Sequence, residues 1–382
     1  MRVGICSYWF NRGQGVVARQ IRSALDSLGH ETFVLARPTR ASNIRPAFVD
    51  RSGVWDQPRV TEASAYEIPT EELLAWAREN ELEVALFDQN YRFAAIEAVR
   101  KAGTRTIARF VWEQFSEQHV EPAKRALDVV YSLTGCEQQR YAAMGIESPR
   151  VRWGIHPELL SYARERPGGE GVGRGSGAEQ PAGRLFFYPA GFLSKRKPVS
   201  QLLKAFRRVE GDELRLIVKG QVEREMELLE RGARRDPRVE VVLEDLPSDE
   251  HLRLFASADV CIAPSRWEGL GLHLYESMAL GLPVITNDNP PMNEVIRDGE
   301  NGLLVSGRRR GRAKSGIPAY LPGVRELSGA MRHAIEPETL ERLRAGVRAA
   351  RERLAWERTV SDFAELLERL TDSPPAPPPR AP

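Results

Sequence analysis

The sequence predicts an α/β protein built from two Rossmann-like, doubly wound domains, and three observations support this. The chain opens with a buried strand at Val3–Ser7, a helix at Val16–Leu28 and a second strand at Thr32–Ala36, the βαβ start of such a sheet. Apolar runs of strand length then keep alternating with helical patterns as far as Val305. The length of 382 residues exceeds one ordinary core, and the glycine-rich stretch Glu165–Gly183 separates two such halves.

The first half continues this alternation after an irregular stretch at Pro38–Thr70. Its further elements are helices at Glu71–Asn80, Phe93–Ala102 and Gln138–Met144 and strands at Val84–Phe87, Thr106–Val111 and Leu127–Leu133. In an open α/β sheet, ligands bind beside the loops that follow the carboxyl ends of the strands. Asp88–Tyr91 and Trp112–Phe115 occupy such loops.

The second half repeats the pattern. We predict strands at Leu185–Gly191, Leu214–Val218, Val239–Leu243, Val260–Pro264, Pro283–Thr286 and Leu303–Val305, and helices at Val199–Val209, Met226–Gly232, Asp249–Ala256, Leu272–Leu280 and Leu340–Leu370. The basic run Ser306–Gly316 is expected to be a mobile, solvated loop. We therefore expect domains at 1–164 and 184–350, a flexible linker at 165–183, a last helix at 351–372 and a disordered tail at 373–382.

Composition excludes several classes of protein. A net charge of +2 argues against a dedicated nucleic-acid binder. Cys6, Cys136 and Cys261 lie far apart in or near apolar runs, so we expect buried free thiols. No apolar run has the length of a membrane span and no signal peptide is evident, so we expect a cytoplasmic protein, with peripheral membrane contact left open.

The stretch from Val260 to Val305 carries the strongest chemical signal. Glu268 lies in a loop between a strand and a helix, and Glu276 lies within that helix among apolar residues. A carboxylate in such a helix needs a polar partner, and polyol hydroxyls are good ones. The loop Gly269-Leu270-Gly271-Leu272 leads into the helix, so its glycines and free N–H groups favour a phosphate or a sugar.

This stretch resembles the donor site of glycosyltransferase family 4, the retaining enzymes of the GT-B fold among the glycosyl transferases of group 1. The shared signature is E-x7-E at Glu268 and Glu276, preceded by Pro264-Ser265 and followed by the sequence GLPVIT and by Glu294. The resemblance implies two Rossmann-like domains facing each other across a cleft, with a terminal helix returning to the first. It also implies that Glu268 holds the sugar hydroxyls and that Glu276 holds the ribose.

A basic turn follows the first strand of the second domain. Arg196 and Lys197 lie between that strand and the next helix, where cations can meet a diphosphate. The family pattern there is G-R-L-x-x-x-K-G, and Gly191, Leu193 and Lys197 match it. Phe192 replaces the arginine and Pro198 the last glycine. Lys197 is therefore the expected diphosphate ligand, with Arg196 as an unmatched substitute.

A second glycine motif lies near the N-terminus. Gly13 and Gly15 fit a dinucleotide fingerprint, but six residues separate them from the strand, and the second strand ends in Arg37 rather than in an acid. Arg37 could serve a 2′-phosphate, so NADP stays an alternative. In the resembled family a glycine-rich loop occupies this place and faces the donor phosphates and the acceptor.

The first domain departs from the family at one loop. Many relatives carry a histidine near the transferring sugar, whereas this chain has Trp112-Glu113. Glu113 is a catalytic candidate, Trp112 a candidate for stacking on a sugar, and His119 an alternative that is more often a surface residue.

The resemblance implies retaining transfer of a hexose from a nucleoside-diphosphate sugar to an acceptor hydroxyl. Lys197, Arg196 and the N–H groups of Gly269–Leu272 would stabilise the leaving diphosphate without a metal, and no D-x-D motif argues for one. No cofactor beyond the donor is expected. The acceptor stays unknown, whether small molecule, glycan or lipid-linked. The alternatives are a GT-B nucleotide-sugar epimerase, an NADP-dependent oxidoreductase and a non-catalytic sugar-binding homologue.

Overall fold

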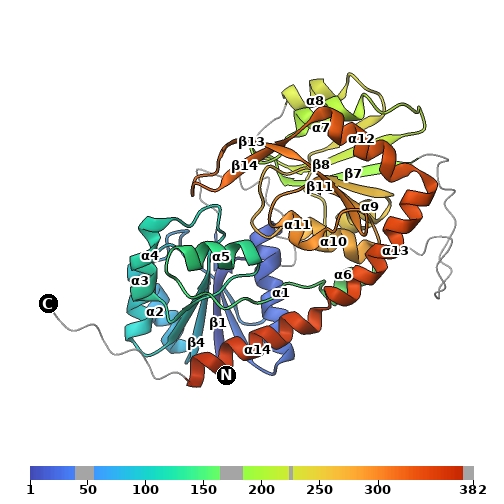
Figure 1. The fold of residues 1–382 in the computed structure, drawn as a ribbon. Coiled ribbons are helices and arrows are strands. Elements are labelled where there is room, and N and C mark those ends of the chain that lie inside the picture. The colour runs from blue at the N-terminus through green and yellow to red at the C-terminus, as the bar shows by residue number, and fades with distance from the viewer. Residues whose placement is uncertain (39–55, 164–183, 223–226, 373–382) are drawn as a thin grey trace. The chain divides into compact units, whose positions relative to one another are not determined.

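The computed structural model describes residues 1–38, 56–163, 184–222 and 227–372 (Figure 1). The predicted linker at 165–183, the predicted tail at 373–382 and part of the irregular stretch at 38–70 lie outside the described residues. The chain divides into two compact units. The first comprises Met1–Gly154, Ala313–Ile317 and Trp356–Pro382, and the second comprises Ile155–Arg312 and Pro318–Ala355.

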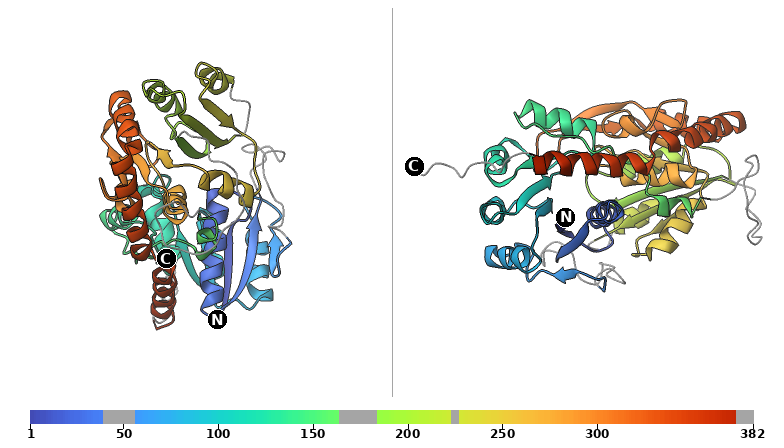
Figure 2. Two further views of the ribbon diagram at one scale, coloured as in Figure 1. Left: turned by 90° about the vertical axis from the view of Figure 1, so that its right-hand side faces the viewer. Right: turned by 90° about the horizontal axis from the view of Figure 1, so that it is seen from below.

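The first unit is built on a sheet of six parallel strands in the order β3-β2-β1-β4-β5-β6. The strands are β1 (Arg2–Tyr8), β2 (Glu31–Arg37), β3 (Val60–Glu62), β4 (Val84–Asp88), β5 (Arg105–Arg109) and β6 (Val129–Val130). The helices are α1 (Gly13–Ser27), α2 (Thr70–Glu79), α3 (Phe93–Lys101), α4 (Val120–Ala126), α5 (Gly135–Ala143) and α14 (Trp356–Asp372). Helix α14 packs against α1, as Figure 2 shows.

The second unit has a sheet of six parallel strands in the order β12-β11-β10-β7-β8-β9. They are β7 (Leu185–Phe192), β8 (Arg215–Gln221), β9 (Val239–Val242), β10 (Val260–Ala263), β11 (Val284–Asn287) and β12 (Gly302–Val305). Its helices are α6 (Pro157–Leu160), α7 (Val199–Phe206), α8 (Glu227–Ala233), α9 (Ser248–Ala256), α10 (Leu272–Leu280), α11 (Met292–Val295), α12 (Val324–Ile335) and α13 (Pro337–Arg353).

Both sheets share one topology, which confirms the predicted fold class. Numbered from its own first strand, each sheet runs 3-2-1-4-5-6, the doubly wound order of dinucleotide-binding folds. The order reverses between the first and fourth strands, which are β1 and β4 in one unit and β7 and β10 in the other. Ligands of such sheets bind at that switch point, outside the carboxyl ends of the strands.

Burial explains why these apolar runs became central strands. Val3, Ile5 and Cys6 of β1 and Cys261, Ile262 and Ala263 of β10 are fully buried, as expected where helices cover both faces of a parallel sheet. Cys6, Cys136 and Cys261 are all buried and free, which confirms the prediction for the cysteines.

The structure differs from the prediction in three details. The compact units divide at Gly154, near the predicted boundary at 164, and Ile155 N donates to Leu354 O at 2.8 Å within the second unit. The predicted helix Leu340–Leu370 is two helices, α13 and α14, which break at Leu354–Ala355 where this contact forms. The basic run 306–316 is not entirely a loop, because its residues Gly307–Arg312 form strand β13, which pairs antiparallel with β14 (Pro318–Pro322).

No helix in the described ranges combines the length and the apolarity that a membrane crossing requires.

Candidate nucleotide-sugar site

Two loops meet at the switch point of the second sheet. Strands β7 and β10 are neighbours there, with Val260 opposite Phe186. The turn after β7 carries Arg196 and Lys197, and the loop after β10 carries Glu268. The parallel topology thus brings together residues that are 71 positions apart in sequence.

Lys197 and Glu268 form a buried ion pair. Lys197 Nζ lies 2.5 Å from Glu268 Oε1 and donates to Ser265 Oγ at 3.0 Å. Arg196 Nη1 lies 3.3 Å from the other carboxylate oxygen of Glu268. The side chains of Lys197 and Glu268 are only 2% and 5% exposed, whereas that of Arg196 is 23% exposed. One carboxylate therefore has a cation on each oxygen.

The charge balance keeps Glu268 ionised. Burial would raise its pKa, but Arg196, Lys197 and the hydrogen bond from Lys197 outweigh burial and hold the pKa below its usual range. A buried ion pair contributes little net stability, because removing two charges from water offsets their attraction. Lys197 can therefore exchange part of this pairing for an anionic ligand at a modest energetic cost.

Helix α10 presents its N-terminus beside this pair. Gly271 is the N-cap residue, with φ at 78°, and as a glycine it has no side chain to cap the first N–H groups. The left-handed φ favours glycine at this position. The first turn also contains no acidic residue, so its partial positive charge is available to an anion. Gly269 and Leu270 are buried before it, and Leu272 is half-buried at its start.

Glu276 lies one turn further into α10 and is half-buried. It has no hydrogen-bond or ion-pair partner among the described residues. Burial raises its pKa from an ordinary 4.5 to about 7. Among the described residues this carboxylate therefore still lacks the polar partners that a buried carboxylate needs.

The elevated pKa of Glu276 gives a testable pH dependence. The folded protein holds a proton on Glu276 up to about pH 7, whereas the unfolded chain loses it near 4.5. The contribution of Glu276 to the free energy of unfolding therefore falls as pH rises through this window. We expect Glu276→Gln to stabilise the protein more at pH 8 than at pH 5, measured by urea unfolding at both values. A difference that does not change with pH would contradict this assignment.

Arg266 ties the loop of Glu268 to its neighbours. Arg266 N donates to Arg196 O at 2.9 Å and Tyr320 N donates to Arg266 O at 3.0 Å. Its guanidinium donates to Lys195 O at 3.2 Å and to Arg310 O. This explains why the arginine-rich run folds as a hairpin, because Arg266 holds both of its strands. A pocket of about 820 Å³ opens beside this junction and is lined by Phe192, Lys195, Lys197, Gln201, Val222, Arg266 and other residues.

Sequence reasoning left three polar residues of this site without a role. Ser265 accepts a hydrogen bond from Lys197, the hydroxyl of Tyr188 is buried without a hydrogen-bond partner in the described part of the chain, and His273 is 7% exposed in the first turn of α10. The position of His273 in the otherwise apolar start of that helix was the sequence signal from which it could have been predicted as a site residue.

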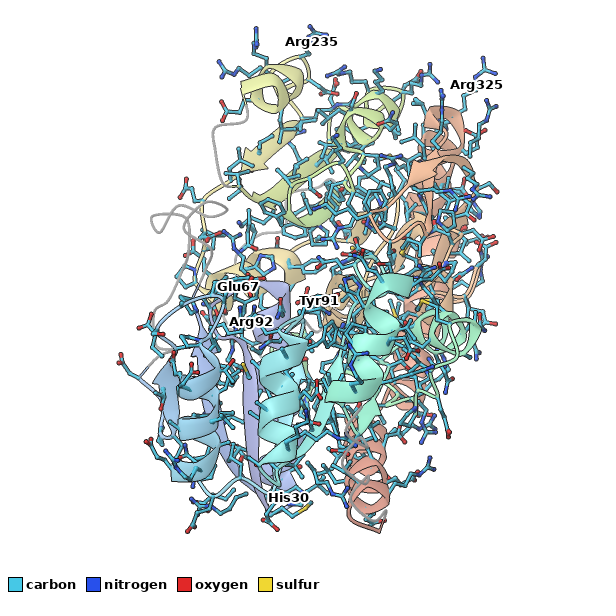
Figure 3. All side chains as sticks on the ribbon, turned by 90° about the vertical axis from the view of Figure 1, so that its left-hand side faces the viewer. His30, Glu67, Tyr91, Arg92, Arg235 and Arg325 are labelled. Carbon is cyan, nitrogen blue, oxygen red and sulfur yellow. The ribbon has the colours of Figure 1, made fainter. Side chains whose placement is uncertain are left out.

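The other predicted site residues belong to the first unit. Figure 3 labels Tyr91 and Arg92, which follow β4, at one end of its sheet, and His30, which precedes β2, at the other. At the first of these ends Asp88 accepts a hydrogen bond from Ser7 at 3.1 Å, and Gln14 donates to the Asp88 backbone at 3.1 Å. The switch point of this sheet thus also carries a carboxylate.

Gly13 and Gly15 differ in their surroundings. Gly13 is exposed at the first position of α1, where it can approach a ligand. Gly15 is buried, and a Cβ atom on it would lie 2.2 Å from Phe10 O. Close packing against Phe10 is therefore sufficient to explain why position 15 is a glycine.

This close approach predicts a loss of stability. Gly15→Ala is expected to lower the free energy of unfolding by about 1–3 kcal/mol, because the backbone must shift to admit the methyl group. Gly329→Ala in α12 is the matched control, since no heavy atom lies within 4 Å of its new Cβ. It should stabilise the protein by about 0.5–1 kcal/mol, as alanine does in helices. Equal melting temperatures for the two variants would refute the packing argument.

Glu113 is half-buried in the turn after β5, and its carbonyl accepts from Ser315 N at 3.3 Å. Trp112 is buried, being 7% exposed. His119 Nδ1 accepts from Ser116 N at 3.0 Å, and its ring packs 4.8 Å from that of Tyr91. His119 therefore has a local structural role, while the role of Glu113 stays a prediction.

Arg37 does not suit a cofactor phosphate. It is 2% exposed, donates to Gln89 O at 3.0 Å and to Tyr66 O at 3.2 Å, and packs over the ring of Tyr66 at 4.3 Å. Its guanidinium thus already contacts Gln89 and Tyr66 of the protein. Arg37 as a ligand for a 2′-phosphate was the reason to consider NADP, and these contacts remove that reason.

Comparison with known proteins shows similarity to glycosyltransferases. Residues 178–321 match the family described as "Glycosyl transferases group 1". A D-inositol 3-phosphate glycosyltransferase of Acidothermus cellulolyticus is 38% identical over 93 residues, which cover 24% of this chain and 21% of that protein. The putative glycosyltransferase EpsD of Bacillus subtilis is 50% identical over 58 residues, 15% of each chain. The matches thus span about a fifth or less of these relatives.

Solved structures match over nearly the whole chain. Sucrose-phosphate synthase of Thermosynechococcus elongatus superposes with a TM-score of 0.71 at 16% identity, covering 97% of this chain and 99% of that one. Anabaena Alr3699/HepE, solved in complex with UDP and glucose, superposes with a TM-score of 0.69 at 14% identity, covering 97% and 100%. These similarities show that the fold is GT-B.

Proposed function

We propose, from the match of residues 178–321 to the glycosyl transferases of group 1, that the protein transfers a hexose from a nucleoside-diphosphate sugar to an acceptor hydroxyl. The observation that carries the proposal is the pair of cations, Lys197 and Arg196, on the carboxylate of Glu268 beside the uncapped start of α10.

Each group has a distinct task in this proposal. Lys197, Arg196 and the first N–H groups of α10 bind the diphosphate and stabilise the negative charge that it gains as the leaving group. Glu268 accepts hydrogen bonds from the sugar hydroxyls, and Glu276 accepts them from the ribose. Two fixed cations and a helix N-terminus can replace a metal at the diphosphate, so we propose a metal-independent reaction. Transfer that persists in excess EDTA would support this.

Retention is the second part of the proposal. The acceptor hydroxyl attacks from the side that the diphosphate leaves, and its proton passes to that diphosphate. The anomeric configuration of the product, read by proton NMR of the transferred sugar, tests this directly.

The acceptor is proposed to bind the first unit. Gly13 at the start of α1 and the loop of Glu113 are its candidate contacts. Several relatives are named D-inositol 3-phosphate glycosyltransferases, so a phosphorylated cyclitol belongs in any acceptor panel. Arg308, Arg309 and Arg310 are exposed on β13 of the second unit, where such a cluster of positive charge favours acidic ligands.

The experiment that tests the function is a donor panel. The protein is incubated with UDP-, GDP- and ADP-sugars, first alone and then with acceptors, and the release of nucleoside diphosphate is measured. If the protein is a transferase, an acceptor should accelerate the release of nucleoside diphosphate. A new sugar nucleotide formed without any acceptor would indicate an epimerase instead, and binding without turnover would indicate a non-catalytic homologue.

A further inference from the structure

His273 has an unusual place in α10. It is the second residue of the helix, after the left-handed Gly271 and five positions beyond Glu268. Only 7% of the residue is exposed. Ser277, another buried polar side chain of this helix, is satisfied because its hydroxyl donates to His273 O at 2.6 Å.

The ring of His273 is not satisfied. Its Nε2 is buried and has no hydrogen-bond partner among the described residues. A buried polar atom without a partner costs about 1–3 kcal/mol, and such atoms are uncommon in native interiors. An atom of this kind at a ligand site indicates that the ligand supplies the missing partner.

The surrounding charges define the state of the ring. Burial lowers the pKa of His273, Lys197 and Arg196 lower it further, and Glu268 only partly opposes them, so that the pKa falls to about 3. The ring is therefore neutral near pH 7, and a neutral imidazole offers one N–H donor and one acceptor nitrogen.

We propose that His273 is a donor-binding residue whose Nε2–H donates to the distal phosphate of the nucleoside diphosphate. This inference rests on the proposed function. Lys197, Arg196 and the start of α10 all favour an anion on this side of the helix, and the phosphates are the charged groups of such a donor. A sugar hydroxyl would satisfy the nitrogen equally but would not use these positive charges.

A neutral donor has an advantage at this position. The distal phosphate gains negative charge as the sugar leaves, and a hydrogen bond to it strengthens at that moment. A third cation beside Lys197 and Arg196 would repel both of them in the free protein. His273 adds a hydrogen bond without adding that repulsion.

The test compares the binding of UDP with UMP, of GDP with GMP and of ADP with AMP, by isothermal titration calorimetry. His273→Leu is expected to weaken binding of the preferred diphosphate about 10–100-fold, as loss of a hydrogen bond to a charged group does. Binding of the monophosphate should be unchanged. His273→Gln, which keeps an N–H donor at similar reach, should recover most of the affinity.

His251 in α9 provides a matched control. Burial also lowers its pKa, to about 4, and it packs 6.1 Å from the rings of Phe187 and Phe255. His251→Leu should leave both affinities as in the wild type.

The outcomes separate this inference from the proposed function. Wild-type affinity in His273→Leu, or an equal loss for diphosphate and monophosphate, would overturn the role of His273 and leave the function intact. If His273→Leu does not fold, a diphosphate affinity of His273→Gln far below that of the wild type would overturn it as well. A wild-type protein that binds none of UDP, GDP and ADP would defeat both proposals.

Discussion

Lys197→Ala is expected to lower kcat for sugar transfer about 100–1,000-fold, the loss seen when one donor to a developing anion is removed. Lys197 Nζ is the buried cation of the site, bonded to Glu268 and Ser265. Arg196, the other cation on Glu268, is partly exposed. Initial rates at saturating donor measure the effect.

Lys204→Ala is the matched control for this variant. Lys204 lies in α7 and is exposed, so its removal should change kcat less than about threefold. Wild-type turnover in Lys197→Ala, with the fold intact by circular dichroism, would show that the diphosphate is not bound here.

Glu268→Ala is expected to abolish transfer and also to destabilise the protein. The substitution removes the acceptor for the sugar hydroxyls and leaves the charge of Lys197 buried without its partner. Breaking a buried ion pair in this way costs about 3–5 kcal/mol. Glu268→Gln keeps the shape and separates the two effects, because it should retain more stability than Glu268→Ala while still losing transfer.

The pKa of Glu268 adds a stability signature. Its folded value lies below the ordinary 4.5, so the stabilisation is present above pH 4.5 and is lost as the pH falls further. Urea unfolding at pH 7 and pH 3 should show a smaller gap between wild type and Glu268→Gln at pH 3. Full transfer activity in Glu268→Gln would contradict the role of its carboxylate.

Much of the fold follows from the sequence because buried parallel strands leave a clear pattern. Val3–Ser7 lies within β1 (Arg2–Tyr8), and Val260–Pro264 covers β10 (Val260–Ala263). Each is a short apolar run bounded by polar residues, as a strand covered on both faces must be. The start of α10 could be placed as well, because Gly271 and Gly281 flank it at left-handed φ angles.

The misplaced elements depend on contacts between distant residues. No local pattern marks Arg308–Arg312 as a strand, because the hairpin forms through Arg266, more than forty positions earlier. The break between α13 and α14 likewise depends on Ile155. Helical periodicity continues across that break, so the sequence predicts one helix.

The candidate site was predictable in part, for a similar reason. Lys197 and Glu268 stand in motifs whose residue types suit a diphosphate and a sugar, but only the sheet topology brings them within 2.5 Å of each other. Gly15 and Arg37 have motif-like positions, yet packing against Phe10 and Tyr66 accounts for them. A single sequence does not separate a glycine needed by packing from one needed by a ligand.

The most direct test of the central claim is a crystal structure with the nucleotide-sugar that the donor panel selects. The account predicts diphosphate oxygens within about 3.2 Å of Lys197 Nζ and of the first N–H groups of α10. It also predicts sugar hydroxyls on Glu268 and ribose hydroxyls on Glu276. A donor bound elsewhere, with the ion pair of Lys197 and Glu268 still closed at 2.5 Å, would contradict it.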